Sequence, residues 1–263
     1  MNAWSKCEQS NNDKSFSPSE KVQEILDNLC EQYKAEGRGI APNEVSFSIC
    51  LQSWFKSTQP YAAERAEEIL RRKEEFSRGT SDGVLRMKVQ DYNSVISKWK
   101  NDPILGPDHA RRLFDEMMQK YNESHDETIA PTIVTFNTLL DVYAKSANGN
   151  SAEKAESLLK QMKHMHREGK SIILPDMISY RICMDAWIRQ RQDDSPQKVD
   201  ELVNYMMDKY KREGRKDLIP DANSFNLILK ACAQSRGSWA DDQQIQFPYR
   251  GPTSTTNPNH VDH

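Results

Sequence analysis

The chain has 263 residues, of which 37% are hydrophobic and 29% charged, and its formal net charge of −3 argues by itself against nucleic acid as a partner. No stretch approaches the roughly 18 consecutive apolar residues of a transmembrane helix, so no membrane partner is expected. The five cysteines form no CxxC pair and are odd in number, which makes a disulfide framework or a zinc site unlikely on chemical grounds and indicates a reducing compartment.

The first recurring element is a stripe of one aromatic residue with apolar residues three, four and seven positions later, which is one face of an α-helix. We call it the A helix and expect it over residues 44–57, 88–100, 133–146, 177–191 and 222–236. Its first aromatic recurs every 44 or 45 residues, at Phe47, Tyr92, Phe136, Tyr180 and Phe225. The position seven residues later holds Trp54, Trp99, Tyr143, Trp187 and, in the last copy, Cys232. These stripes are interpreted as core rather than as platforms for stacking bases.

A second pattern follows each A helix: a small or β-branched residue, then apolar residues three and four positions later. It recurs in Val22/Ile25/Leu26, Ala66/Ile69/Leu70, Ala110/Leu113/Phe114, Ala155/Leu158/Leu159 and Val199/Leu202/Val203. We call the predicted helix the B helix. Prolines 18, 107 and 196 precede three of its starts, and Ser151 offers an N-cap for another. Lys73 interrupts the apolar stripe of one copy.

A proline followed by a polar residue separates most B helices from the next A helix, in the pairs Pro42-Asn43, Pro131-Thr132, Pro175-Asp176 and Pro220-Asp221. Proline stops the B helix, and the polar residue can cap the A helix. Met87–Lys88 lacks both devices, so a looser junction is expected there.

A helix pair this short cannot bury its apolar stripes alone, whereas stacked pairs share a continuous core. The sequence therefore predicts an all-α α-solenoid of stacked antiparallel helix pairs over residues 1–236. The complete repeats are 44–88, 89–132, 133–176 and 177–221, with partial repeats 1–43 and 222–236. Residues 237–263 are polar, rich in proline and without periodicity, which predicts a disordered tail. Because Trp4 falls inside an earlier A helix, the chain is expected to be a fragment.

The phrase "VTFNTLLDVYAKS…AEKAESLLKQM…PD" resembles the pentatricopeptide repeat family, down to the hydroxyl–aromatic–Asn run Thr135-Phe136-Asn137. The other A helices are weaker versions in the same register. Family repeats are usually about 35 residues long, so the repeats of 44–45 residues are an extended variant. The resemblance implies a right-handed superhelix that binds single-stranded RNA, one base per repeat, without a cofactor or metal. It also implies organellar RNA processing, stability or translation in a mitochondrion or chloroplast, although no targeting peptide is visible at the N-terminus.

In that family, the residue after the first aromatic and the residue that closes the repeat face the base edge. The corresponding base-reading residues here are Ser48/Lys88, Asn93/Thr132, Asn137/Asp176 and Arg181/Asp221, with Asn226 opening a further repeat. Asn137/Asp176 matches the family's uracil pair, because a carboxamide can pair with a pyrimidine edge and a carboxylate can orient it. Lys88 and Arg181 fit the pattern poorly. The base-flanking residues, two before the aromatic, are Val45, Val134 and Ile178.

The predicted A helices carry ten Lys or Arg and four Asp or Glu, which gives them +6 and leaves −9 for the rest of the chain. In such arrays the A helices line the concave face, so a basic track for phosphates is expected there. The proposed phosphate contacts are Lys6, Lys56, Lys100, Lys145 and Arg189.

Two other classes of function agree less well with the sequence. A scaffold that binds a protein segment in the same groove, as tetratricopeptide-type arrays do, would tolerate the poor reading pairs but does not explain the basic track. An enzyme is not expected, since no nucleophile–base pair, phosphate loop or HExxH motif is present. His164 and His166 point to different helix faces, so no metal site is expected either.

Overall fold

The computed structural model describes residues 17–36, 40–79, 85–169 and 173–234. Within these ranges the chain is all-helical, with ten α-helices and no strand. The A helices are α2 (Glu44–Lys56), α4 (Val89–Lys98), α6 (Ile133–Lys145), α8 (Met177–Gln190) and α10 (Ala222–Gln234). The B helices are α1 (Pro18–Glu36), α3 (Ala62–Gly79), α5 (Gly106–Ser124), α7 (Ser151–Arg167) and α9 (Ser195–Glu213). Every helix predicted from the 44- and 45-residue spacing is therefore present.

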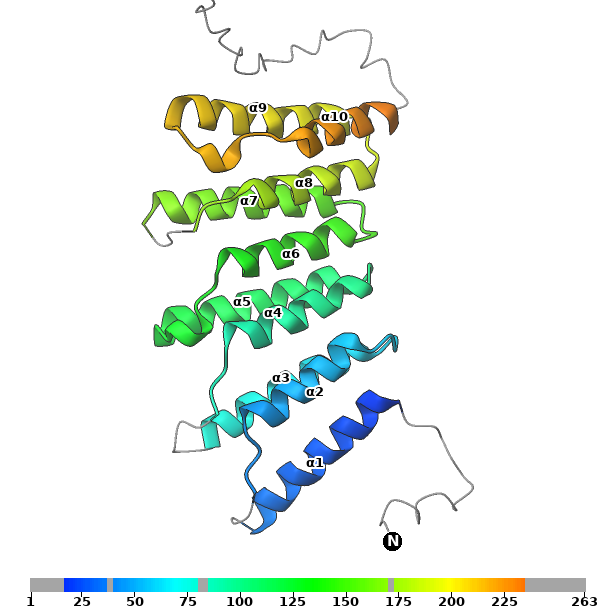
Figure 1. Ribbon diagram of the computed structural model, residues 1–263, viewed down its shortest axis with the longest axis vertical. Helices are drawn as coiled ribbons and strands as arrows, with labels where there is room; N and C mark the ends of the chain where they lie inside the picture. Colours follow the sequence, from blue (N-terminus) through cyan, green and yellow to red (C-terminus); the bar gives the residue numbers. More distant parts are fainter. Residues whose placement is uncertain (1–16, 37–39, 80–84, 170–172, 235–263) are drawn as a thin grey trace, which may run out of the picture.

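The helices lie one above another along the long axis of the molecule, from α1 at one end to α9 and α10 at the other (Figure 1). The A helices α2, α4, α6 and α8 each pack against the B helices before and after them and against the next A helix, and α10 packs against α8 and α9. No two B helices in the described part of the chain approach each other as closely. Long side chains connect the B helices instead, in the ion pairs Arg72–Asp27, Arg112–Glu67 and Lys154–Asp108.

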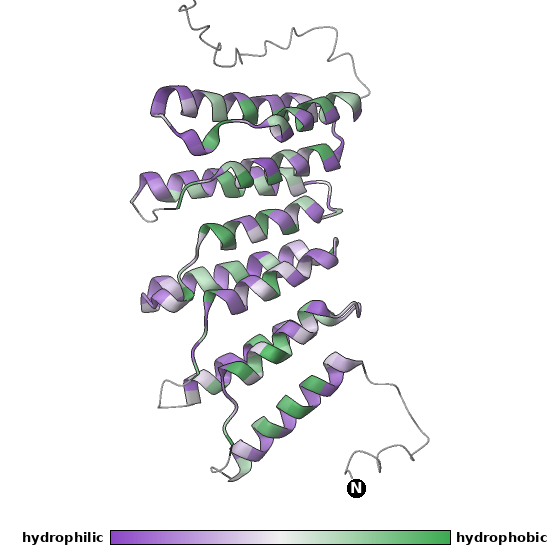
Figure 2. Cartoon of the chain, viewed as in Figure 1, coloured by the Kyte–Doolittle hydropathy of each residue, from purple (hydrophilic) through white to green (hydrophobic). Residues whose placement is uncertain are grey.

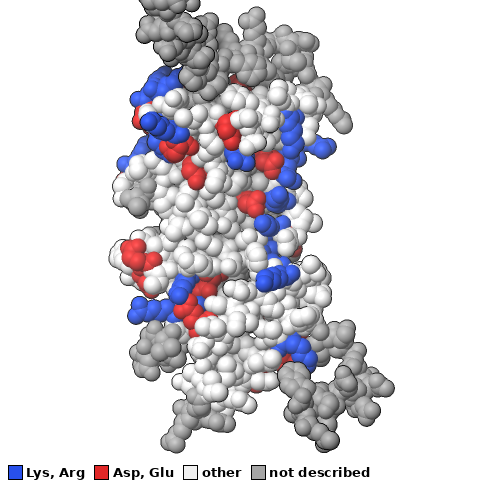
Figure 3. Space-filling model, viewed as in Figure 1, with Lys and Arg blue, Asp and Glu red and all other residues white. Residues whose placement is uncertain are grey.

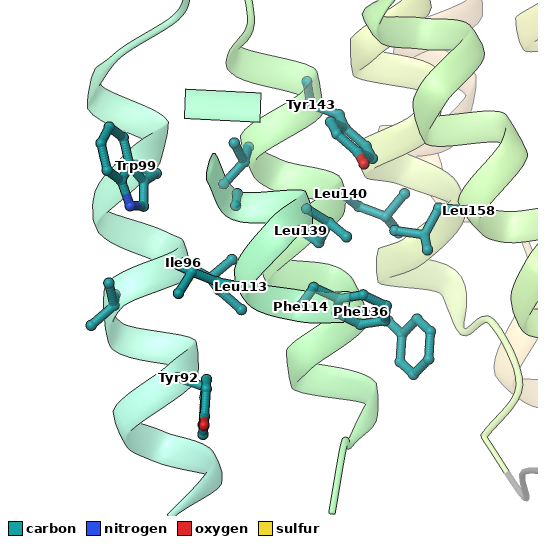
Figure 4. Packing of buried hydrophobic residues seen from close by; sticks show 14 of the residues in the cluster. Tyr92, Ile96, Trp99, Leu113, Phe114, Phe136, Leu139, Leu140, Tyr143 and Leu158 are labelled. Atoms are coloured by element: carbon teal, nitrogen blue, oxygen red, sulfur yellow. The ribbon is translucent and has the colours of Figure 1, made fainter. Parts of the chain in front are cut away.

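The aromatic stripes form the core, as predicted. The first aromatics of the four A helices from α2 to α8 are at most 2% exposed, and the second aromatics at most 3%. Figure 4 shows Tyr92 and Ile96 on α4 and Trp99 directly after it, and the rings of Phe114 and Phe136 meet edge to face at 5.0 Å. Each helix shows both a hydrophobic and a hydrophilic side (Figure 2), as burial of a single stripe requires.

The predicted caps are largely confirmed. Asn43, Asp176 and Asp221 each accept the backbone N–H three residues on, at 3.0, 2.8 and 2.9 Å. At Thr132 the donor and acceptor are exchanged. The backbone N–H of Thr132 donates to the side-chain Oγ1 of Thr135 at 3.1 Å. The cap expected from Ser151 is wrong, because Asn150 takes the N-cap place without a side-chain bond and Ser151 is the first helical residue.

The start of α7 receives its cap from another helix. The backbone N–H of Ala152 donates to Oε1 of Gln190, at the end of α8, at 2.8 Å. A side chain 38 residues away thus satisfies a donor that no local residue reaches.

Near Met87–Lys88, a buried ion pair holds the start of α4, and residues 80–84 of this junction lie outside the described residues. Lys73, which breaks the apolar stripe of α3, is fully buried and its Nζ lies 2.6 Å from Asp91 Oδ2. The same carboxylate accepts the backbone N–H of Lys88 at 2.9 Å. Asp91 therefore caps the start of α4 and also pairs with the charge of Lys73. The other A helices are preceded by a proline, which this junction lacks.

Candidate functional site

The A helices expose a row of aliphatic side chains at equivalent positions. Val45, Val134 and Ile178, expected to flank bases, are 62%, 58% and 54% exposed. Each lies two residues before a buried aromatic, and a shift of two positions turns a side chain about 200° around a helix, away from the core. The sequence pattern therefore places one exposed aliphatic residue on each of three A helices.

Asn137 and Asp176, the pair that matches the uracil reader, are in contact. Asn137 Nδ2 donates to Asp176 Oδ1 at 3.3 Å, although the residues are on α6 and at the start of α8. Ser179 joins them: its Oγ lies 2.6 Å from Asn137 Oδ1 and 2.9 Å from Asp176 Oδ1. The cap of α8 thereby fixes the carboxylate that Asn137 touches.

This cluster leaves a donor and an acceptor next to each other. Within the described chain, Asp176 Oδ2 has no hydrogen-bond partner, and the Asn137 amide has a second N–H beyond its bond to Asp176. Both residues are half-buried. An adjacent N–H and carboxylate oxygen can pair with a neighbouring acceptor and N–H on a pyrimidine edge.

The second predicted pair is not joined by a hydrogen bond in the described structure. Asn93 Oδ1 is buried without a partner, whereas Thr132 is exposed. Thr132 Oγ1 lies 3.5 Å from Thr135 Oγ1, within its own cap.

One residue of each remaining pair already has a partner. Lys88 forms an ion pair with Glu44, and Ser48 is half-buried on α2. Asp221 accepts from Ser224 N, Ser224 Oγ and Asn223 Nδ2, so both of its oxygens are occupied. The bond from the Ser224 backbone, with a smaller contribution from the Arg181 charge, lowers the pKa of Asp221.

Asn226, which opens the next repeat, is exposed on α10. Arg181 is half-buried on α8 and lies beside a hollow of about 430 Å³ between α6, α8 and α10, with Ile178 and Asp185 in its wall. The hollow shares helices α6 and α8 with the Asn137 cluster, and Leu227 of α10 completes its wall.

Cations gather where the A helices end. Figure 3 shows a row of Lys and Arg along the right-hand side of the molecule, at the end where α2, α6, α8 and α10 terminate in Figure 1. Lys56 and Lys145 are exposed there, without an ion pair among the described residues. Lys100 lies 3.4 Å from Asp141, and Arg189 lies 2.5 Å from Asp185. Lys6 lies outside the described residues.

One of the ten cations counted in the predicted track is buried. Lys98 is 5% exposed, and its Nζ donates to the carbonyl oxygens of Phe55 at 3.0 Å and Ser57 at 2.5 Å. Burial lowers the pKa of Lys98. This lysine therefore satisfies the last carbonyls of α2 instead of facing a ligand, and Arg236 lies outside the described residues.

The described part of the chain holds no group of His, Cys, Asp and Glu residues that could bind a metal. Burial raises the pKa of Cys30 to about 11 and that of Cys50 to about 12, so both are protonated, packed thiols near neutral pH. No described helix is long and apolar enough to cross a membrane. Comparison with protein-family models, curated proteins and solved structures finds no match to this chain.

Proposed function

We propose that the chain is an extended pentatricopeptide-type α-solenoid, a right-handed superhelix whose A helices bind single-stranded RNA. The observation that carries this proposal is the Asn137–Asp176 contact, with exposed Val134 and Ile178 on the same two A helices. These four side chains offer two apolar contacts for the faces of a base and a donor–acceptor pair for its edge.

The packing of the helices supports the solenoid. Successive A helices contact one another directly, whereas successive B helices are bridged mainly by long charged side chains. A stack that is closer on one side than on the other curves toward the closer side, which makes the A helices the concave lining. Exposed Lys56 and Lys145 would lie along the edge of that groove, where a phosphate backbone gains from positive charge.

The proposed activity is binding without catalysis, and its biological setting follows from the family resemblance alone. That setting is RNA processing, stability or translation in a mitochondrion or chloroplast. Binding of RNA would then protect or present a transcript, with the chemistry left to other proteins.

The test is competition among short oligonucleotides that vary at one base, at fixed salt. Uracil is expected to be preferred at the base facing Asn137, by the worth of one or two hydrogen bonds, about 1–2 kcal/mol. Asn137→Ala should erase that preference and spare general affinity. Asn204→Ala, at an exposed position of α9, is the matched control. Equal affinity for all four bases in every register would contradict base reading by this chain.

A protein-binding scaffold is the second candidate, and one observation favours it. The middle of the surface in Figure 3 is largely uncharged, and Ile49 adds a further 54%-exposed aliphatic residue to α2. Salt separates the two functions, because phosphate binding weakens steeply as salt rises and binding to an apolar groove does not.

A further inference from the structure

The hollow between α6, α8 and α10 combines polar and aliphatic walls. Its volume is about 430 Å³, and its lining includes Asp141 of α6, Arg181 and Asp185 of α8, and Leu227 of α10. Ile178, 54% exposed, lies in the same wall. The three helices are successive A helices that pack against one another, so the hollow belongs to the side of the stack and not to an end of it. Its size is that of a site for a small ligand.

Arg181 has no partner of its own in the described structure. It is half-buried, and none of its five N–H donors forms a hydrogen bond or an ion pair with a described residue. Asp185, one helical turn later, is the ordinary partner for such an arginine, but it pairs with Arg189 instead. The charge of Arg181 contributes to the lowered pKa of Asp221, but both Asp221 oxygens are held within the cap of α10. The donors of Arg181 are therefore available to a ligand.

The two carboxylates of the hollow each keep one oxygen without a hydrogen bond among the described residues. Asp141 Oδ2 lies 3.4 Å from Lys100 Nζ, and Asp141 Oδ1 has no such contact there. Asp185 Oδ2 accepts from Arg189 Nε at 2.5 Å, whereas Asp185 Oδ1 lies 3.8 Å from Lys230 Nζ, beyond hydrogen-bond distance. Because these cations already balance the charge of both carboxylates, the remaining oxygens can accept N–H groups from a neutral ligand.

Guanine is the base whose edges match this lining. Its O6 and N7 accept two parallel hydrogen bonds from an arginine, and its N1–H and N2 amine donate side by side to carboxylate oxygens. Adenine places a donor at N6 beside N7, and cytosine and uracil have no N7. The other three bases therefore leave part of the arginine fork unpaired. Ile178 and Leu227 add aliphatic contacts for the ring.

We propose that the hollow between α6, α8 and α10 binds a guanine base through Arg181, Asp141 and Asp185. The combination occurs once in the array, because the position of Arg181 holds serine or asparagine in the other A helices. The acceptors are aspartates five residues after the first aromatic of an A helix, and Asp221 is not among them. That the base belongs to an RNA strand rests on the proposed function, whereas the recognition of guanine does not. In such a strand, this guanine would lie one A helix away from the base that faces Asn137.

The first test uses the full chain and the four nucleoside monophosphates in isothermal titration calorimetry at millimolar concentration. All four carry the same phosphate and ribose, so a difference between them reports on the base. Guanosine monophosphate should bind at least about tenfold more tightly than the others. Arg181→Met keeps much of the side-chain length but removes its donors, and should abolish this preference. Arg167→Met, at an exposed position of α7, is the matched control. Equal binding of the four nucleotides, or no detectable binding of any, would overturn the proposal.

A guanosine monophosphate analogue with carbon in place of N7 separates direct contact from a structural role of Arg181. The analogue should bind the wild type several-fold more weakly than guanosine monophosphate does. Arg181→Met should bind the two ligands alike, because the contact that the analogue removes is already absent. An equal loss in both proteins would show that Arg181 does not contact N7, and the proposal would be wrong. Circular dichroism of the variant confirms that its helices are intact.

Oligonucleotides distinguish the source of the guanine, and they also separate this proposal from RNA binding itself. A strand of uracils with one guanine should bind more tightly than the same strand without it, and more tightly than guanosine monophosphate. Selective binding of the mononucleotide by a chain that binds no RNA would support the guanine site and reject the RNA-binding proposal. RNA binding with a uracil preference set by Asn137, but without a preference for guanine in either form, would reject the guanine site alone.

Discussion

Lys73 and Asp91 occupy positions that the other helix pairs fill with neutral residues. The counterparts of Lys73 are Leu29, Met117, Met162 and Met206, and those of Asp91 are Ser46, Thr135, Ser179 and Ser224. Both members of the pair are buried, with 0% and 8% of their side chains exposed. A buried ion pair adds little to the stability of the fold compared with a neutral pair. A buried charge without its partner lowers that stability strongly.

Replacement of one residue of the pair should therefore lower the free energy of unfolding more than replacement of both. Lys73→Met is expected to lower the free energy of unfolding by about 3–5 kcal/mol, because it leaves the Asp91 carboxylate buried and unpaired. Asp91→Ser should do the same to Lys73. The double variant recreates the residues of the other pairs and should recover most of the loss. Urea denaturation of the four proteins gives the coupling energy, and additive losses would contradict a paired role.

The lowered pKa of Glu67 predicts how the free energy of unfolding changes with pH. Burial raises the pKa of this carboxyl group, but hydrogen bonds from Arg112 and Arg71 outweigh burial and leave the pKa lowered. A lowered pKa in the folded state stabilises the fold above the unfolded value, about 4.3, and this contribution is lost as pH falls through the folded pKa.

The corresponding experiment compares wild type with Glu67→Gln in urea between pH 7 and pH 3. The glutamine variant should be less stable at pH 7 and should lose less stability on acidification. Glu68→Gln, at an exposed position beside it, is the control. Parallel curves for wild type and Glu67→Gln would show that the Arg112 and Arg71 bonds do not govern this carboxylate.

At the level of helices, two B helices place the residue after their small position against the second aromatic of the next A helix. Glu67 Oε2 accepts the indole N–H of Trp99 at 3.2 Å. Where the aromatic is Tyr143, burial raises the pKa of its phenol, and the charge of Arg111 on the B helix opposes that rise. In these two pairs the B-helix residue suits the chemistry of the ring, whereas the indole N–H groups of Trp54 and Trp187 are buried without a hydrogen-bond partner in the described structure.

Substitutions at Arg111 and Tyr143 test whether the two side chains depend on each other. Arg111→Glu is expected to destabilise the chain by about 1–3 kcal/mol, because it removes the cation that faces the phenol oxygen and places a second carboxylate beside Asp115. Tyr143→Trp in the same chain removes that oxygen and supplies an N–H that can donate to the new carboxylate, so it should recover part of the loss. Thermal unfolding followed by circular dichroism measures both, and no recovery would contradict the pairing of the two positions.

The helices were predictable from the sequence because their signals are local. Apolar spacing, prolines and capping residues lie within one element, and the repeat multiplies each signal. The Asn137–Asp176 pair was found only through the family resemblance. The cap from Gln190, the burial of Lys98 and the Lys73–Asp91 pair all join residues from different helices, so no window of sequence contains both partners.

At the level of the whole molecule, the cations at the ends of the A helices differ in whether they form an ion pair. Lys100 and Arg189 already have carboxylate partners, whereas Lys56 and Lys145 have none in the described structure. If phosphates bind along this edge, the unpaired lysines should carry most of the salt dependence.

Lys56→Gln with Lys145→Gln should therefore weaken binding to every RNA sequence alike. The plot of log affinity against log salt should flatten by up to about 0.7 for each phosphate that the double variant no longer binds. Replacement of the exposed cations Arg167 and Lys211, on B helices, by glutamine is the matched control. Equal slopes for the two double variants would mean that the A-helix lysines face away from the RNA.

The Lys73–Asp91 pair also limits how this array can change by duplication and deletion. Lys73 belongs to the repeat 44–88 and Asp91 to the repeat 89–132, so a recombination event between these repeats leaves one buried charge in each product. Repeats 133–176 and 177–221 carry neutral residues at both positions and can be copied or deleted singly. We therefore expect a duplication or deletion that separates these two repeats to be more destabilising than one that keeps them together.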